Sequence, residues 1–154
     1  GQKSLMVYEC KFIASQNEHE EFILEVKVPI MSLCPCSREI SDRGAHNQRS
    51  IVTVRIKTLG LVWIEDVVNL VENSASSDLY ALLKREDEKF ITEKAYDNPK
   101  FAEDIVRQIA VELEKIPQIT YFSVETENYE SIHNHNAYAS ISRKVEYKKI
   151  NNQS

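Results

Sequence analysis

The chain has few of the residues that mark fibrous, exported or membrane-spanning proteins. It contains only 3 glycines and 4 prolines, which excludes collagen-like and low-complexity sequence. No apolar run approaches the roughly 20 residues that a membrane-spanning helix needs, and no signal-peptide pattern is present. Three cysteines is an odd number, which argues against a disulfide framework. We therefore expect a soluble, cytoplasmic domain with reduced thiols and no membrane partner.

Basic residues are also in the minority. The chain has 19 basic and 24 acidic residues, and a net charge of -5 disfavours nucleic acid as a partner. Residues 31–57 are the exception, because they hold five basic and only two acidic residues. Such a short basic patch fits a small anionic ligand better than a polymer. A solvated surface is the competing interpretation, and charge alone favours it.

The hydrophobic pattern predicts an α+β domain. Alternation of apolar and polar residues predicts strands over 7–14, 21–28, 52–57, 121–126 and 137–147. Apolar residues at three- and four-residue steps predict two helices, over 63–83 and from Asn98-Pro99 to Pro117. Asn98 is expected to cap the second of these helices, with Pro99 at its first position. The predicted order is therefore strands, helix, helix, strands, with both helices on one face of an antiparallel sheet. Edge strands of such a sheet could pair with a neighbouring subunit.

The connection over residues 31–50 does not fit this simple pattern. It is long for a loop in a compact domain, and it contains Cys34, Cys36 and His46. Thiolate and imidazole are good ligands for zinc-like ions, and the lack of a second cysteine pair favours an open site over a closed structural one. His133 and His135 offer further ligands or acid–base groups, although a histidine in a turn is more often structural. Cys10, inside a predicted strand, is interpreted as a small hydrophobe.

Five separated motifs, in order, closely resemble GTP cyclohydrolase type IB, a prokaryotic enzyme that starts folate biosynthesis. They are SLCPCSREIS (32–41), GAHNQRS (44–50), LKREDEKFITEKAY (83–96), NPKFAED (98–104) and ESIHNH (130–135). The resemblance implies the tunnelling fold, in which sheet modules pair edge to edge in a homo-oligomer, a tetramer in this family. Because the family's chains are longer, residues 1–154 are expected to form one tunnelling-fold module, the catalytic C-terminal half.

The same resemblance implies a reaction and the residues that perform it. GTP and water would give 7,8-dihydroneopterin triphosphate and formate. Cys34, Cys36 and His133 would be catalytic, Glu103 would bind guanine, and Arg43 and Arg49 are candidates for binding the triphosphate. The resemblance further implies a divalent metal (zinc, manganese or iron) with three protein ligands: Cys34, His46 and Glu88.

Three other functions remain compatible with the sequence. Archaeal relatives of the family use similar residues and form a cyclic-phosphate pterin. A tunnelling-fold nitrile reductase of the queuosine pathway would use a cysteine as covalent nucleophile without a metal. A zinc-stabilised interaction module would instead have a closed four-ligand site and would unfold on chelation.

Overall fold

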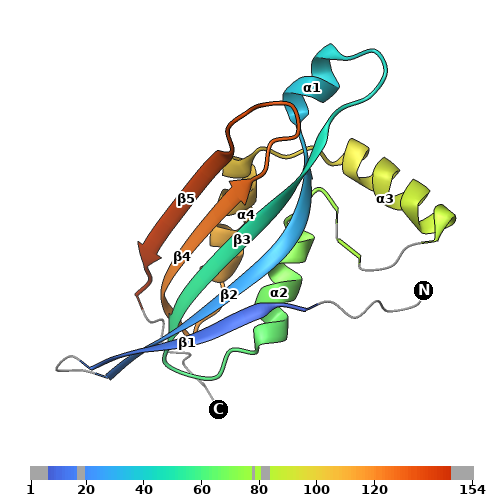
Figure 1. Cartoon of the computed structure of the whole chain (residues 1–154). Coiled ribbons are helices and arrows are strands. Elements are labelled where there is room, and N and C mark those ends of the chain that lie inside the picture. The colour runs from blue at the N-terminus through green and yellow to red at the C-terminus, as the bar shows by residue number, and fades with distance from the viewer. Residues whose placement is uncertain (1–6, 17–19, 78, 81–83, 147–154) are drawn as a thin grey trace.

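The protein is built on one antiparallel sheet of five strands, arranged in the order β1-β2-β3-β4-β5 (Figure 1). The computed structural model describes residues 7–16, 20–77, 79–80 and 84–146. The strands are β1 (Glu9–Gln16), β2 (Glu20–Leu33), β3 (Asn47–Thr58), β4 (Ile119–Asn128) and β5 (Ala137–Lys144). Each strand is thus a neighbour, in the sheet, of the strands that precede and follow it in the sequence.

Four helices complete the fold: α1 (Pro35–Ile40), α2 (Ile64–Asn73), α3 (Arg85–Asp97) and α4 (Ala102–Leu113). Helices α2 and α4 cover one face of the sheet, whereas α3 projects to the side (Figure 1). The core lies between the sheet and these two helices. Its fully buried side chains include Val26, Val54 and Phe122 of the sheet, facing Val67 of α2 and Ile105 of α4. No helix among the described residues is long and apolar enough to cross a membrane.

The α+β class and the five strands are confirmed, but the order of elements is not the predicted one. Two helices were missed: α1, inside the supposed long loop, and α3. In α3 only Ile91 and Ala95 are buried, so a charge-rich sequence forms a helix without a wide apolar stripe. The strands β2 and β3 also extend further than predicted, which shortens the connection between them to residues 34–46.

The helix predicted over 63–83 is wrong beyond residue 73, where α2 ends. The apolar spacing continues past this point, but the Ser74 hydroxyl donates back to the Leu70 carbonyl at 2.9 Å, and Ser77 forms an isolated bridge with Met31 of β2. Serine hydroxyls compete with helical hydrogen bonds in this way. Leu82 and Leu83, also part of that prediction, lie outside the described residues.

The predicted start of the last helix is also displaced. Asn98 was expected to cap it, but α4 begins at Ala102, where the Phe101 amide donates to the Asp104 carboxylate at 3.2 Å. The Asn98 side chain instead donates to the Ala75 carbonyl at 2.9 Å. The Asn98 side chain therefore forms a tertiary hydrogen bond instead of capping the helix.

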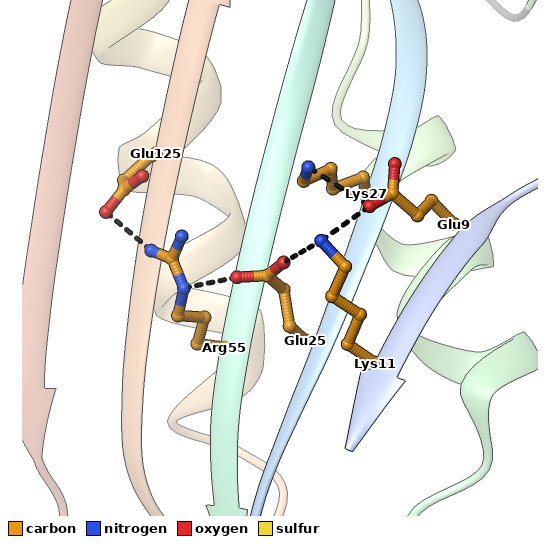
Figure 2. A network of polar contacts seen from close by, with 6 residues as sticks. All are labelled: Glu9, Lys11, Glu25, Lys27, Arg55 and Glu125. Carbon is orange, nitrogen blue, oxygen red and sulfur yellow. Dashed lines mark hydrogen bonds and ion pairs between the residues drawn. The ribbon is translucent and has the colours of Figure 1, made fainter. Parts of the chain in front are cut away.

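The face of the sheet that the helices leave uncovered has an alternating chain of charges across four strands (Figure 2). Glu25 of β2 lies opposite Lys11 of β1 and Arg55 of β3, and its side chain is only 8% exposed. Arg55 donates to Glu25 at 2.6 Å and to Glu125 at 2.7 Å. Partial burial works against the Arg55 charge, but these hydrogen bonds outweigh it and raise the pKa of the guanidinium. Glu9 bridges Lys11 and Lys27 at the other end of the chain.

We expect Glu25→Gln to lower the free energy of unfolding by about 1–3 kcal/mol, because it leaves Arg55 partly buried beside a neutral partner. Glu125→Gln is the matched control, since its carboxylate is 33% exposed and water can replace it. Urea denaturation of both variants measures the difference. Equal losses of unfolding free energy in the two variants would show that the greater burial of Glu25 does not strengthen its ion pair with Arg55.

Candidate active site

The two residues at the centre of the sequence prediction, Cys34 and His46, are held together by the backbone. The Cys34 amide donates to the His46 carbonyl at 3.1 Å, which continues the β2–β3 pairing by one residue. The Ser37 hydroxyl donates to the Cys34 carbonyl at 3.1 Å and accepts from the His46 amide at 3.2 Å. Pro35 follows Cys34 at the first position of α1, where its fixed φ favours a helix start. Cys34 is half-buried and Cys36 is exposed.

The connection between β4 and β5, which contains His133 and His135, lies at the same end of the sheet (Figure 1). The rings of His46 and His133 are 6.4 Å apart, edge to face, and those of His133 and His135 are stacked at 5.4 Å. Ser131 Oγ lies 3.3 Å from His46 Nδ1. The structure therefore brings together Cys34, His46 and His133, three of the residues selected from the sequence.

Glu103 is at the same end, in the first turn of α4. The Lys100 amide just before this helix donates to the Leu33 carbonyl at 3.1 Å, which ties the start of α4 to the residue preceding Cys34. A carboxylate is favourable near a helix N-terminus, because the peptide dipoles leave positive charge there. Glu103 is exposed, and no hydrogen bond or ion pair among the described residues engages its carboxylate. It is therefore accessible to a ligand.

Glu88 does not join this group. It is exposed in the first turn of α3, and Figure 1 shows that the N-terminal end of α3 is the end farther from the sheet. Within the described ranges, no three His, Cys, Asp or Glu side chains are arranged to bind one metal ion. The sulfur and nitrogen donors of Cys34 and His46 suit a zinc-like metal, but they supply only two of the three predicted ligands. The three-residue ligand set thus stays a prediction.

The basic residues predicted around the loop are dispersed. Arg43 is exposed and lines a groove against Thr92 and Glu93 of α3. Arg49 is exposed on β3, where alternation places it on the face away from the helices. Arg55 is neutralised by its two glutamates, as described above. The basic patch is therefore weaker than the residue count suggested, and the structure does not bring Arg43 and Arg49 into one contact.

Several polar residues at this end were not singled out from the sequence. Gln48 is buried, its amide nitrogen donates to Glu130 at 3.0 Å, and its amide oxygen has no partner among the described residues. A buried acceptor of this kind is expected to bind water or a polar ligand group. The two motifs over 44–50 and 130–135 contain Gln48, Glu130 and Ser131, so the motifs could have indicated these residues from the sequence.

Cys10 differs from the other two thiols. It lies in β1 and packs against the hydrophobic core. Desolvation, with a smaller contribution from the nearby Glu65 carboxylate, raises the pKa of its thiol. A raised pKa reduces the thiolate fraction and therefore the nucleophilicity of this cysteine. Cys10 thus serves as a control for experiments on Cys34.

Comparisons with known proteins identify the family of this chain. A family model described as "Type I GTP cyclohydrolase folE2" matches residues 1–139. GTP cyclohydrolase FolE2 of Geotalea uraniireducens (strain Rf4) is 59% identical over 152 residues, 99% of this chain and 56% of that protein. The proteins of the same name from Citrifermentans bemidjiense and Kosmotoga olearia are 56% and 51% identical, over 94% and 93% of this chain and 54% and 56% of theirs. The chain spans about half the length of the curated relatives it matches. The chain belongs to the type I GTP cyclohydrolase family of FolE2 proteins.

Proposed function

We propose that this chain contains the catalytic module of a type IB GTP cyclohydrolase, corresponding to the C-terminal half of that family's proteins. The reaction would be hydrolysis of GTP to 7,8-dihydroneopterin triphosphate and formate. The observation that supports it most directly is the convergence of Cys34, His46 and His133 at the sheet end where α4 presents Glu103. The family match and relatives named GTP cyclohydrolase FolE2 support the same conclusion.

Guanine would be recognised by Glu103. Its carboxylate can accept two hydrogen bonds, from N1–H and from the 2-amino group of the base. Adenine has no such pair of donors, so this contact would distinguish GTP from ATP. Arg43 and Arg49 are exposed and remain the proposed ligands of the triphosphate, through charge-assisted hydrogen bonds.

Hydrolysis requires water to attack C8 of guanine, opening of the five-membered ring, and departure of formate. Each stage moves a proton to or from a ring nitrogen or oxygen. His133 and Cys36 are exposed at the site, and we assign them to hold and transfer these protons. The His46 ring lies edge to face beside His133, and the Ser131 hydroxyl lies within hydrogen-bond distance of His46 Nδ1.

Cys34, His46 and Glu88 are the proposed ligands of a divalent metal, which would be zinc, manganese or iron. Sulfur and nitrogen donors at Cys34 and His46 suit such an ion, and a third, carboxylate ligand would leave a position open for substrate. The metal would supply Lewis acidity to the hydrolysis.

The proposed assembly is a homo-oligomer of tunnelling-fold modules in the cytoplasm. Strands β1 and β5 each pair on one side only within the described sheet, so both leave edge hydrogen-bonding groups for another chain. We expect light scattering to give a molar mass that is a multiple of 17.8 kDa. A monomer at all protein concentrations tested would contradict edge pairing.

Cys34→Ala is expected to abolish both metal binding and formation of dihydroneopterin triphosphate, since it removes the proposed thiolate ligand. Metal content is measured by elemental analysis, and the product by chromatography, which also separates a cyclic-phosphate pterin. Cys10→Ala is the matched control and should retain both properties. Unchanged metal content and full turnover in Cys34→Ala would contradict the assignment of Cys34 as a metal ligand.

Glu103→Gln is expected to lower kcat/KM for GTP by about 100-fold or more, because the amide presents an N–H group where guanine also has donors. Metal content should stay at the wild-type level. Glu112→Gln, near the other end of the same helix, should behave as wild type. Loss of metal from Glu103→Gln would instead place this carboxylate in the metal site.

A further inference from the structure

A buried turn over residues 74–77 runs beside the end of β2. All four residues are at most 3% exposed. The Ser76 amide donates to the Met31 carbonyl at 3.2 Å, and the Leu33 amide donates to the Ser76 hydroxyl at 3.2 Å. The turn therefore supports the last residues of β2, directly before Cys34.

Two side chains from the link between α3 and α4 bind the carbonyls of this turn. Asn98 Nδ2 donates to Ala75 at 2.9 Å and to Ser76 at 3.3 Å. Lys100 Nζ donates to the Ser74 carbonyl at 3.0 Å and to the Gln108 amide oxygen at 2.7 Å. Partial burial lowers the pKa of the Lys100 ammonium, while the nearby Asp104 carboxylate acts in the opposite direction. Burying an ammonium costs free energy unless it is hydrogen-bonded, and here the Ser74 carbonyl and the Gln108 amide oxygen are its acceptors.

The backbone of Lys100 completes the connection. Its amide donates to the Leu33 carbonyl at 3.1 Å, while the amide on the other side of the same peptide bond, that of Cys34, donates to His46. One peptide unit is thus bound from two directions. Lys100 also lies only three residues before Glu103. The contacts of Asn98 and Lys100 therefore span the space between the thiol end of the site and the guanine-binding carboxylate.

We propose that Asn98 and Lys100 are positioning residues, which fix the start of α4 relative to the Leu33–Cys34 peptide and so set Glu103 in register with Cys34 and His46. The inference rests on the proposed function. Guanine must be bound at Glu103 while water attacks C8 near Cys34 and His46. A small displacement between Glu103 and these two residues therefore lowers the reaction rate more than it lowers the affinity for GTP. Neither residue contacts the substrate in this assignment.

The test compares Lys100→Met with Lys115→Met, which removes an ammonium from an exposed position near the end of α4. The stoichiometry of GTP binding, measured by calorimetry, gives the number of sites in each protein that bind GTP. We expect Lys100→Met to bind GTP with wild-type stoichiometry and affinity, and its kcat per GTP-binding site to fall by about tenfold to a hundredfold. Lys115→Met should match wild type. A purely structural role of Lys100 would lower the number of sites and leave turnover per site unchanged.

Amide hydrogen exchange provides a readout that does not depend on activity. In Lys100→Met the amides of Leu33, Cys34 and Lys100 should exchange faster than in wild type, while those of the central strands stay protected. Wild-type exchange at these three amides, or wild-type turnover per site, overturns the inference. If Lys100→Met does not fold, Lys100→Gln keeps one donor and should show the same changes to a smaller degree, and Asn98→Ala tests the second side chain.

The two proposals fail in different ways. If the wild-type chain forms no pterin product from GTP, the proposed function fails, and the exchange data alone decide whether Lys100 anchors the Leu33–Cys34 peptide. If wild type is active and Lys100→Met is equally active per site, the proposed function stands and the positioning role is wrong.

Discussion

The peptide bond between Leu33 and Cys34 is the constraint on which the arrangement of the site depends. Its carbonyl accepts from the Lys100 amide and its N–H donates to the His46 carbonyl. Three segments that are far apart in the sequence meet at this unit: the end of β2, the residue before β3, and the link into α4. Because strand register determines which side chains share a face, a slip by one residue between β2 and β3 would separate Cys34 from His46.

The two faces of the sheet support this arrangement in different ways. The apolar face holds α4 through six buried side chains, which fixes the helix whose first turn contains Glu103. The opposite face holds its strands together through charge pairs, with Glu25 between Lys11 and Arg55. Hydrophobic burial gives the larger energy and disfavours a one-residue slip, which would turn the apolar side chains to the other face. A two-residue slip, however, would keep the same face buried. The ion pairs favour a single register, which the site requires.

The sequence predicted the parts of the structure that local pattern determines. Period-two alternation located all five strands, and the four-residue spacing of Ile105 and Ile109 located α4. It failed where tertiary contacts replaced local preferences: the serines after α2 bind β2, and Asn98 binds that turn instead of capping α4. Within the site, the gathering of thiols and an imidazole in one long connection suggested Cys34 and His46. Glu103 was found only through the family resemblance, because an acidic residue in the first turn of a helix is ordinary.

The position of α3 follows from the same contacts, and this bears on Glu88. Only Ile91 and Ala95 of this helix are buried, compared with six residues of α4, so hydrophobic packing constrains it weakly. Its C-terminal half is held by Arg38 of α1, which stacks on Tyr96 at 4.9 Å, and by Asn98, whose amide donates to the Ala95 carbonyl. Asn98 therefore restrains the end of α3 with its backbone and the turn beside Cys34 with its side chain. The sheet sets the position of Cys34 relative to His46. The position of Glu88 relative to either residue depends instead on these few contacts at the C-terminal end of α3, opposite to Glu88.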